Sequence, residues 1–133
     1  MPASPMLAIS ADGTIQPFGS PGSEVVGQAQ MQAFLNVHVF GMDPQAAVEA
    51  PRIASYSWPG SALPHSYQPG RINLEGRIDR AIGNALSELG HDVAWWSDFK
   101  WLAGSVCTVR VDGTTGIRKA GADPRRSAYA VGW

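Results

Sequence analysis

The first forty residues show two different periodicities of apolar side chains. Two short apolar runs, Met6 to Ile9 and Ile15 to Phe18, flank a polar segment that contains Asp12-Gly13. An Asp-Gly pair between two such runs is typical of a tight β-hairpin. From Glu24 to about Phe40 the apolar residues recur at helical spacing and cover most of the circumference. We therefore predict an antiparallel hairpin followed by a helix that is buried on two sides.

The rest of the chain alternates short predicted elements with turns. Gly41 suits the end of the first helix, and Asp43-Pro44 is typical of a helix start, which predicts a short second helix that ends before Pro51. Prolines and glycines between residues 59 and 70 predict a long loop. The remaining predicted elements are strands over residues 52–58, 71–74, 91–96, 105–111 and 117–120 and an amphipathic helix with Ile78, Ile82, Leu86 and Leu89 on one face.

These elements predict an α+β fold with mostly antiparallel strands, two main helices and one short one. Strands and helices do not alternate regularly enough for a doubly wound sheet. The 133 residues are 44% hydrophobic and 16% charged, which fits one folded domain over residues 1–133. A formal net charge of −1 provides no broad cationic surface, so we expect neither a nucleic-acid nor a membrane partner.

The single cysteine and the three histidines offer few candidates for other chemistry. The single cysteine, Cys107, lies in an apolar run and is predicted to be buried, and one cysteine excludes an internal disulfide. His38, His65 and His91 lack ligand-like spacing, so we predict no metal and no cofactor. Residues 1–10 do not follow the pattern of a signal peptide, which favours the cytoplasm over the periplasm.

The segment 19–23 (GSPGS) connects the predicted hairpin to the first helix. A helix start presents unpaired backbone N–H groups and a positive dipole end, which can stabilise an anion or a developing oxyanion. The same pattern also fits an ordinary tight turn with Ser20 or Ser23 as the N-cap. Using either serine as a nucleophile would require a neighbouring base that the sequence does not offer.

Two further segments carry residue types that occur in binding sites. Tryptophans and Phe99 crowd residues 95–101, where they could line a substrate pocket or form an exposed patch against a missing subunit; we favour the patch. The segment 123–126 (DPRR) could bind a substrate carboxylate, or its aspartate and arginines could tie the chain end to the body. We favour the structural role.

Several segments, taken in order, resemble the gamma-glutamyltranspeptidase family. They are GSPG at 19–22, QAFLN at 32–36, FGMDP at 40–44, AVEAPR at 47–52 and GADPRR at 121–126. The resemblance covers essentially the whole chain, but only the C-terminal part of the family's small subunit. The segments ASYSWP at 54–59, PH at 64–65 and PGR at 69–71 are more similar to the branch that includes oxamate amidohydrolases.

The resemblance implies a four-layer αββα sandwich of the N-terminal nucleophile hydrolases. Family members cut themselves to expose a threonine that attacks an amide, with its own amine as base. None of Thr14, Thr108, Thr114 and Thr115 matches that threonine, so the chain lacks the nucleophile. The resemblance assigns the oxyanion hole to the backbone N–H groups of Gly22 and Ser23 and substrate contacts to Ser20 and Pro21.

Ser23 stands where the family usually has a second glycine, so a positive φ there would be strained. The family's serine pair for the substrate α-carboxylate has no good match in MPASP at 1–5, where Ser4 fits poorly. The pair either lies upstream or has been replaced, and a replacement would suit a substrate other than a γ-glutamyl amide.

The implied function is cleavage or transfer of a γ-glutamyl or related small acyl group through an acyl-threonine intermediate. The implied partners are the large subunit and the N-terminal part of the small subunit, and this chain alone is expected to be inactive. Apolar faces left uncovered would favour a homo-oligomer. The alternative interpretation is a stand-alone, non-catalytic binding or assembly module with the same fold.

Overall fold

A four-stranded antiparallel sheet forms one side of the molecule. The computed structural model describes residues 4–132. Strands β1 (Met6–Ile9) and β2 (Ile15–Gly19) form the predicted hairpin, with Ile9 opposite Ile15. Strands β6 (Cys107–Val111) and β7 (Arg118–Ala122) complete the order β1-β2-β6-β7. The first and the last strand of the described chain therefore belong to one sheet.

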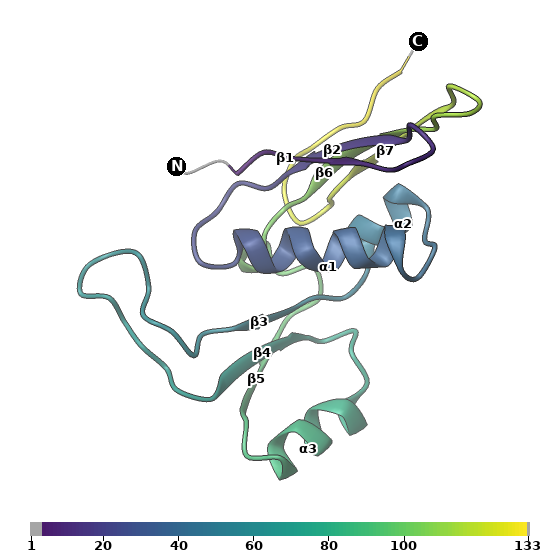
Figure 1. Cartoon of the computed structure of the whole chain (residues 1–133). Helices are drawn as coiled ribbons and strands as arrows, with labels where there is room; N and C mark the ends of the chain where they lie inside the picture. The colour runs from purple at the N-terminus through teal and green to yellow at the C-terminus, as the bar shows by residue number, and fades with distance from the viewer. Residues whose placement is uncertain (1–3, 133) are drawn as a thin grey trace.

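Two helices cover one face of this sheet (Figure 1). Helix α1 (Val26–His38) and the short α2 (Pro44–Glu49) follow β2, and Asp43 caps α2 by accepting a hydrogen bond from the Gln45 N–H at 3.1 Å. The predicted helices are thus confirmed, with shorter bounds for α1. Their inward side chains meet those of the sheet in a small core of Ala29, Ala33, Val48 and Val106, against which Phe18 packs.

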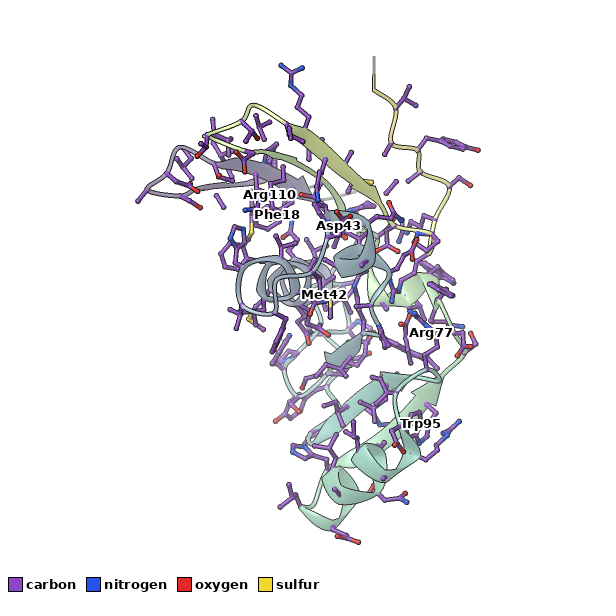
Figure 2. All side chains as sticks on the ribbon, turned by 90° about the vertical axis from the view of Figure 1, so that its right-hand side faces the viewer. Phe18, Met42, Asp43, Arg77, Trp95 and Arg110 are labelled. Atoms are coloured by element: carbon purple, nitrogen blue, oxygen red, sulfur yellow. The ribbon has the colours of Figure 1, made fainter. Side chains whose placement is uncertain are left out.

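A second, three-stranded sheet lies beyond α1 and α2 (Figure 1). It has the order β3 (Ile53–Ser55), β4 (Arg71–Glu75), β5 (Asp92–Trp96), and α3 (Arg80–Glu88) connects β4 to β5. The β4–β5 pair is parallel, whereas the other strand pairs are antiparallel, so the predicted α+β class with mostly antiparallel strands is confirmed. Trp95 reaches toward α3, where a Cβ on Gly83 would collide with its ring (Figure 2).

Two glutamine side chains join α1 to the edge of the second sheet. The Gln28 amide donates to the Ser55 carbonyl at 3.0 Å and accepts from the Ser55 N–H at 2.8 Å. Gln32 makes the same pair of bonds with Ile53, at 2.9 and 3.0 Å. Four helical residues rise about 6 Å and two strand residues about 6.7 Å, so the two spacings match. The amides therefore replace the missing neighbour strand of β3.

The outer face of the four-stranded sheet carries exposed apolar side chains, and Tyr129, Ala130 and Val131 line a pocket beside it. Cross-strand partners alternate between faces, which places Leu7, Pro17, Val109 and Ala120 in one row on this side. Leu7 is 60% exposed and Ile9 67% exposed. Cys107 shares this face and is exposed. The prediction that Cys107 is buried was wrong, because the apolar character of β6 belongs to both of its faces.

Two helix predictions also need correction within the described residues. One strip of α1, with Met31 at 57% and Leu35 at 37% exposure, faces outward rather than into a second buried surface. Of the expected apolar face of α3, Ile82 is exposed, as is Leu89 just after the helix, and Gly83 is the helix residue that packs inward. Both helices therefore carry more apolar surface than the described chain covers.

The glutamine contacts predict a measurable loss of stability in Gln28→Ala. This change would leave the Ser55 N–H and carbonyl without their partners and lower the unfolding free energy by about 1–2 kcal/mol. Urea unfolding of the wild type and variant measures the difference. Gln68→Ala, in the exposed loop, is the matched control and should change stability by less than about 0.5 kcal/mol. Equal effects of both changes would contradict the role of the amide.

Candidate functional site

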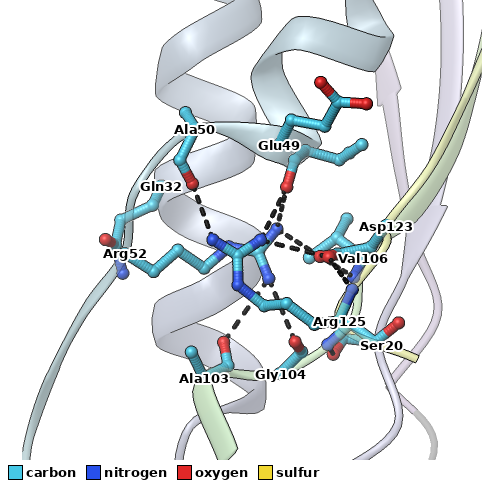
Figure 3. A network of polar contacts seen from close by, with 12 residues as sticks. Ser20, Gln32, Glu49, Ala50, Arg52, Ala103, Gly104, Val106, Asp123 and Arg125 are labelled. Atoms are coloured by element: carbon cyan, nitrogen blue, oxygen red, sulfur yellow. Dashed lines mark hydrogen bonds and ion pairs between the residues drawn. The ribbon is translucent and has the colours of Figure 1, made fainter. Parts of the chain in front are cut away.

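A buried network of charged residues connects β3, β4 and the segment after β7, and Figure 3 shows its members Arg52, Asp123 and Arg125. Arg52 precedes β3, Glu75 ends β4, and Asp123 and Arg125 follow β7. All four residues are at most 5% exposed. Arg52 contacts Asp123 at 2.6 Å, while Arg125 contacts both Asp123, at 3.1 Å, and Glu75, at 2.5 Å. The two arginines and two carboxylates therefore balance in charge where the two sheets meet.

The network also binds backbone groups that would otherwise be buried without partners. Arg52 donates to the carbonyls of Ala103 and Gly104 at 3.4 and 3.2 Å, and Arg125 donates to those of Val48 and Ala50 at 2.8 Å each. These bonds connect the end of α2 with the segment before β6. The structural role predicted for the DPRR segment is confirmed for Asp123 and Arg125.

Glu75 is ionised in this network despite its burial. Burial alone would raise the pKa of the Glu75 carboxyl, but hydrogen bonds and charge from Arg125, with help from Arg77, hold it below its ordinary value. Removing one partner from such a pair leaves an uncompensated buried charge, which typically costs about 3–5 kcal/mol. The network therefore fixes its surroundings rigidly.

Ser20 transmits this rigidity to the GSPGS loop. Its hydroxyl accepts a hydrogen bond from the Ser105 N–H at 3.0 Å and donates to the Pro21 carbonyl at 3.1 Å. The neighbouring Val106 N–H donates to Asp123 at 2.9 Å. Ser20 is 3% exposed, so its hydroxyl is used for holding the loop, and no base contacts it among residues 4–132.

Gly22 and Ser23 occupy the turn before α1. Gly22 has φ +148°, a conformation that favours glycine, and a Cβ there would lie 3.1 Å from Val26. Ser23 does not have a positive φ, so the glycine expected at this position is replaced without backbone strain. Within residues 4–132 neither the Gly22 N–H nor the Ser23 N–H has a hydrogen-bond acceptor.

A pocket of about 320 Å³ opens beside these two residues. It is lined by Gly22, Ser23, Glu24, Val25, Tyr56, Trp101, Leu102 and Arg126. Most of the wall is apolar, and a mostly apolar pocket with a few polar groups is typical of a small-molecule site. Tyr56 also borders a second pocket of about 260 Å³ under the 59–68 loop. The predicted loop therefore lies at a concave surface.

Glu24 connects the turn to the long loop that follows β3. Its carboxylate accepts hydrogen bonds from the Ser61 N–H at 2.8 Å and the Ser61 hydroxyl at 2.9 Å, and Ser23 and Ser61 hydroxyls are 3.0 Å apart. Bonds from Ser23, from its own backbone and from Ser61 lower the pKa of Glu24 to about 2. Sequence reasoning missed Glu24, because its partner is 37 residues away.

The other candidate residues lie away from this pocket. Thr14 and Thr108 are buried beside β2 and in β6, and Thr114 and Thr115 lie in the turn before β7, as predicted. His65 contacts the Gly60 carbonyl, and His38 packs on Phe34. The part of the chain from 4 to 132 contains no group of three potential metal ligands.

In the same part of the chain, no helix has the length and apolar character needed to cross a membrane.

The tryptophan cluster is divided between different surroundings. Trp101 lines the pocket, whereas Trp95 packs under Arg80 at 3.8 Å from its ring centroid and against Gly83. Phe99 lies under Arg77 at 3.7 Å. The alternative that this cluster lines a pocket therefore holds for Trp101. The residue is also 55% exposed. The single domain predicted over residues 1–133 and the comparison of MPASP with the family include residues 1–3 or 133, which lie outside the described residues.

Comparison with known proteins places this geometry in a family. The model of the gamma-glutamyltranspeptidase family matches residues 2–133. The chain belongs to the gamma-glutamyltranspeptidase family. A glutathione hydrolase-like proenzyme of Bacillus subtilis is 32% identical over 115 residues, which are 86% of this chain and 21% of that protein. An oxamate amidohydrolase proenzyme of Klebsiella pneumoniae is 29% identical over 130 residues, 97% of this chain and 23% of that protein.

Solved structures show the same fold. LmbA2991HD matches 91% of this chain and 21% of its own length, with 35% identity and a TM-score of 0.84. A gamma-glutamyltranspeptidase from Pseudomonas nitroreducens matches 98% of this chain and 62% of its own, with 19% identity and a TM-score of 0.75. The chain therefore has the fold of the family's N-terminal nucleophile hydrolases. It spans about a fifth of the curated relatives that it matches.

The lowered pKa of Glu24 predicts an acid-dependent contribution to stability. Because the folded pKa is about 2 and the ordinary value 4.5, the contribution is present above pH 4.5 and is lost as the pH falls toward 2. Glu24→Gln should therefore lower stability at pH 7, and its difference from wild type should shrink below pH 4.5. Urea unfolding across pH 7 to 3 measures this, with the exposed Glu88→Gln as control. A difference that stays constant with pH would contradict it.

Proposed function

We propose that this chain supplies the oxyanion hole of a gamma-glutamyltransferase-like amidohydrolase. The observation that carries the proposal is the position of Gly22 and Ser23 in the turn before α1, where both residues line a pocket. Backbone N–H groups in such a turn stabilise the negative oxygen that forms when a nucleophile attacks an amide carbonyl. Family membership supports the same assignment, since one curated relative is named as a glutathione hydrolase-like proenzyme and another as an oxamate amidohydrolase proenzyme.

In the proposed reaction a threonine outside this chain attacks the amide carbonyl. Its hydroxyl oxygen forms the new bond, the amine leaves with a proton, and water or a second amine then releases the acyl group from the threonine ester. Gly22 and Ser23 hold the oxyanion during both steps. Pro21 shapes the turn, and Ser20 holds it in place against Ser105.

The partners follow from the surfaces that the described chain leaves open. The outer face of the four-stranded sheet, with Leu7, Ile9 and Val109, needs a second layer to bury it. We assign this layer to the large subunit and the N-terminal part of the small subunit. Alone, the chain would be inactive and would self-associate through this face. The cytoplasm stays our proposed location.

The products of the natural gene test the proposal most directly. Intact mass measurement and N-terminal sequencing should find two chains, the smaller one beginning with threonine and containing residues 1–133. Self-cleavage of that kind would establish the enzyme and its nucleophile. One uncut product that begins at Met1 would overturn the proposed function and support the binding or assembly module instead.

Distortion of the turn should reduce catalysis. In the mature enzyme, Gly22→Ala would strain the φ of +148° and bring the new Cβ against Val26, displacing the donors. We expect kcat for a γ-glutamyl anilide to fall about 100-fold with little change in KM. Gly27→Ala is the matched control, because a Cβ there has open space around it. Equal activity of the two variants would exclude the oxyanion role.

A further inference from the structure

The loop between β3 and β4 projects beside the start of α1 (Figure 1) and borders a pocket of about 260 Å³. The Gly60 N–H donates to the Ser66 carbonyl at 2.9 Å, which closes the loop on itself. The Gln68 N–H donates to the Tyr56 carbonyl at 3.2 Å and closes its base. The loop is therefore folded, and the pocket is preformed. Its lining residues are Glu24, Tyr56, Trp58, Gly60, Ala62, Leu63, Ser66 and Gln68.

Glu24 is the only charged residue that lines this pocket in the described chain. Among residues 4–132, no lysine, arginine or histidine nitrogen lies within 4.0 Å of its carboxylate. Hydrogen bonds from Ser23, from its own backbone and from Ser61 hold the pKa of Glu24 at about 2, so it is ionised at neutral pH. Because these donors are neutral, the negative charge has no cationic partner. The pocket therefore favours a positively charged ligand group.

Tyr56 and Trp58 are the aromatic residues of the pocket wall, and Trp58 is 48% exposed, so part of it is open to a ligand. Arginine side chains lie over other aromatic rings of the described chain, those of Trp95, Phe99 and Trp101. No arginine or lysine lies over Tyr56 or Trp58 among residues 4–132. The loop cannot supply one, because residues 53–70 contain no lysine or arginine. A carboxylate beside aromatic rings without a cation is typical of sites that recognise organic ammonium groups.

We propose that the pocket under the 59–68 loop binds a small organic ammonium ion through the Glu24 carboxylate and the rings of Tyr56 and Trp58. A metal ion fits less well, because it needs several oxygen or nitrogen ligands and residues 4–132 hold no group of three potential ligands. An alkylated ammonium group needs one negative charge and apolar or aromatic contacts, which this pocket offers. The inference does not depend on the proposed function.

Two probes of nearly the same shape test the proposal. Choline carries a quaternary ammonium group, and 3,3-dimethylbutan-1-ol replaces its nitrogen by an uncharged carbon. Each probe is titrated with the product of the natural gene, whether or not it cuts itself, and binding is followed by the methyl NMR signal of the probe. We expect choline to bind at least about tenfold more tightly than the alcohol. Equal binding of the two probes, or no binding of choline, would overturn the proposal.

Matched variants locate the site. Glu24→Gln keeps an oxygen that can accept from Ser61 but removes the charge, so it should weaken choline binding about 5–10-fold and leave the alcohol within about twofold. Trp58→Leu should weaken choline binding about 3–10-fold. Glu88→Gln and Tyr67→Leu change exposed residues outside the pocket and should leave choline binding unchanged. Wild-type choline binding in both Glu24→Gln and Trp58→Leu would reject this site. Because the readout is binding rather than turnover, that result would leave the proposed function intact.

Discussion

The buried charges of Arg52, Glu75, Asp123 and Arg125 are the constraint on which the rest of the structure depends. Arg52 precedes β3, Glu75 ends β4, and Asp123 and Arg125 share the segment after β7, so the four residues connect the two sheets. The two guanidinium groups and two carboxylates are buried, so each needs an oppositely charged partner, because an unpaired buried charge costs too much free energy. The network therefore permits only one relative position of these segments.

The candidate site takes its geometry from that fixed position. Asp123 holds the Val106 N–H, the adjacent Ser105 N–H holds Ser20, and Ser20 begins the turn that presents Gly22. Gly104 allows the close approach, since a Cβ there would lie 2.8 Å from Ala29. A short chain of hydrogen bonds thus connects the buried charges to the two N–H groups at the pocket. Preorganised donors of this kind are effective because they need no rearrangement during the reaction.

The described residues form many hydrogen bonds with one another, but they leave large apolar side chains exposed to solvent. Glutamine amides satisfy the edge of β3, and a third one, Gln45, pairs with the Ala122 backbone of β7. In contrast, the outer face of the four-stranded sheet and the outward strip of α1 leave large apolar side chains exposed. Surfaces of this composition are typical of contacts with further protein. This agrees with a chain that matches about a fifth of its curated relatives.

The sequence by itself determined the elements, the family and the turn before α1. Asp12-Gly13, the helical spacing after Glu24 and the prolines of the 59–70 loop act through local backbone preferences, which a linear pattern shows directly. Only the tertiary structure decided which face of a strand is covered, and the exposed Cys107 illustrates this. It also decided that the Arg125 side chain is buried against Glu75 whereas the adjacent Arg126 lines a pocket. It also paired Glu24 with Ser61 across 37 residues. These outcomes depend on contacts between distant segments, and no local pattern contains their geometry.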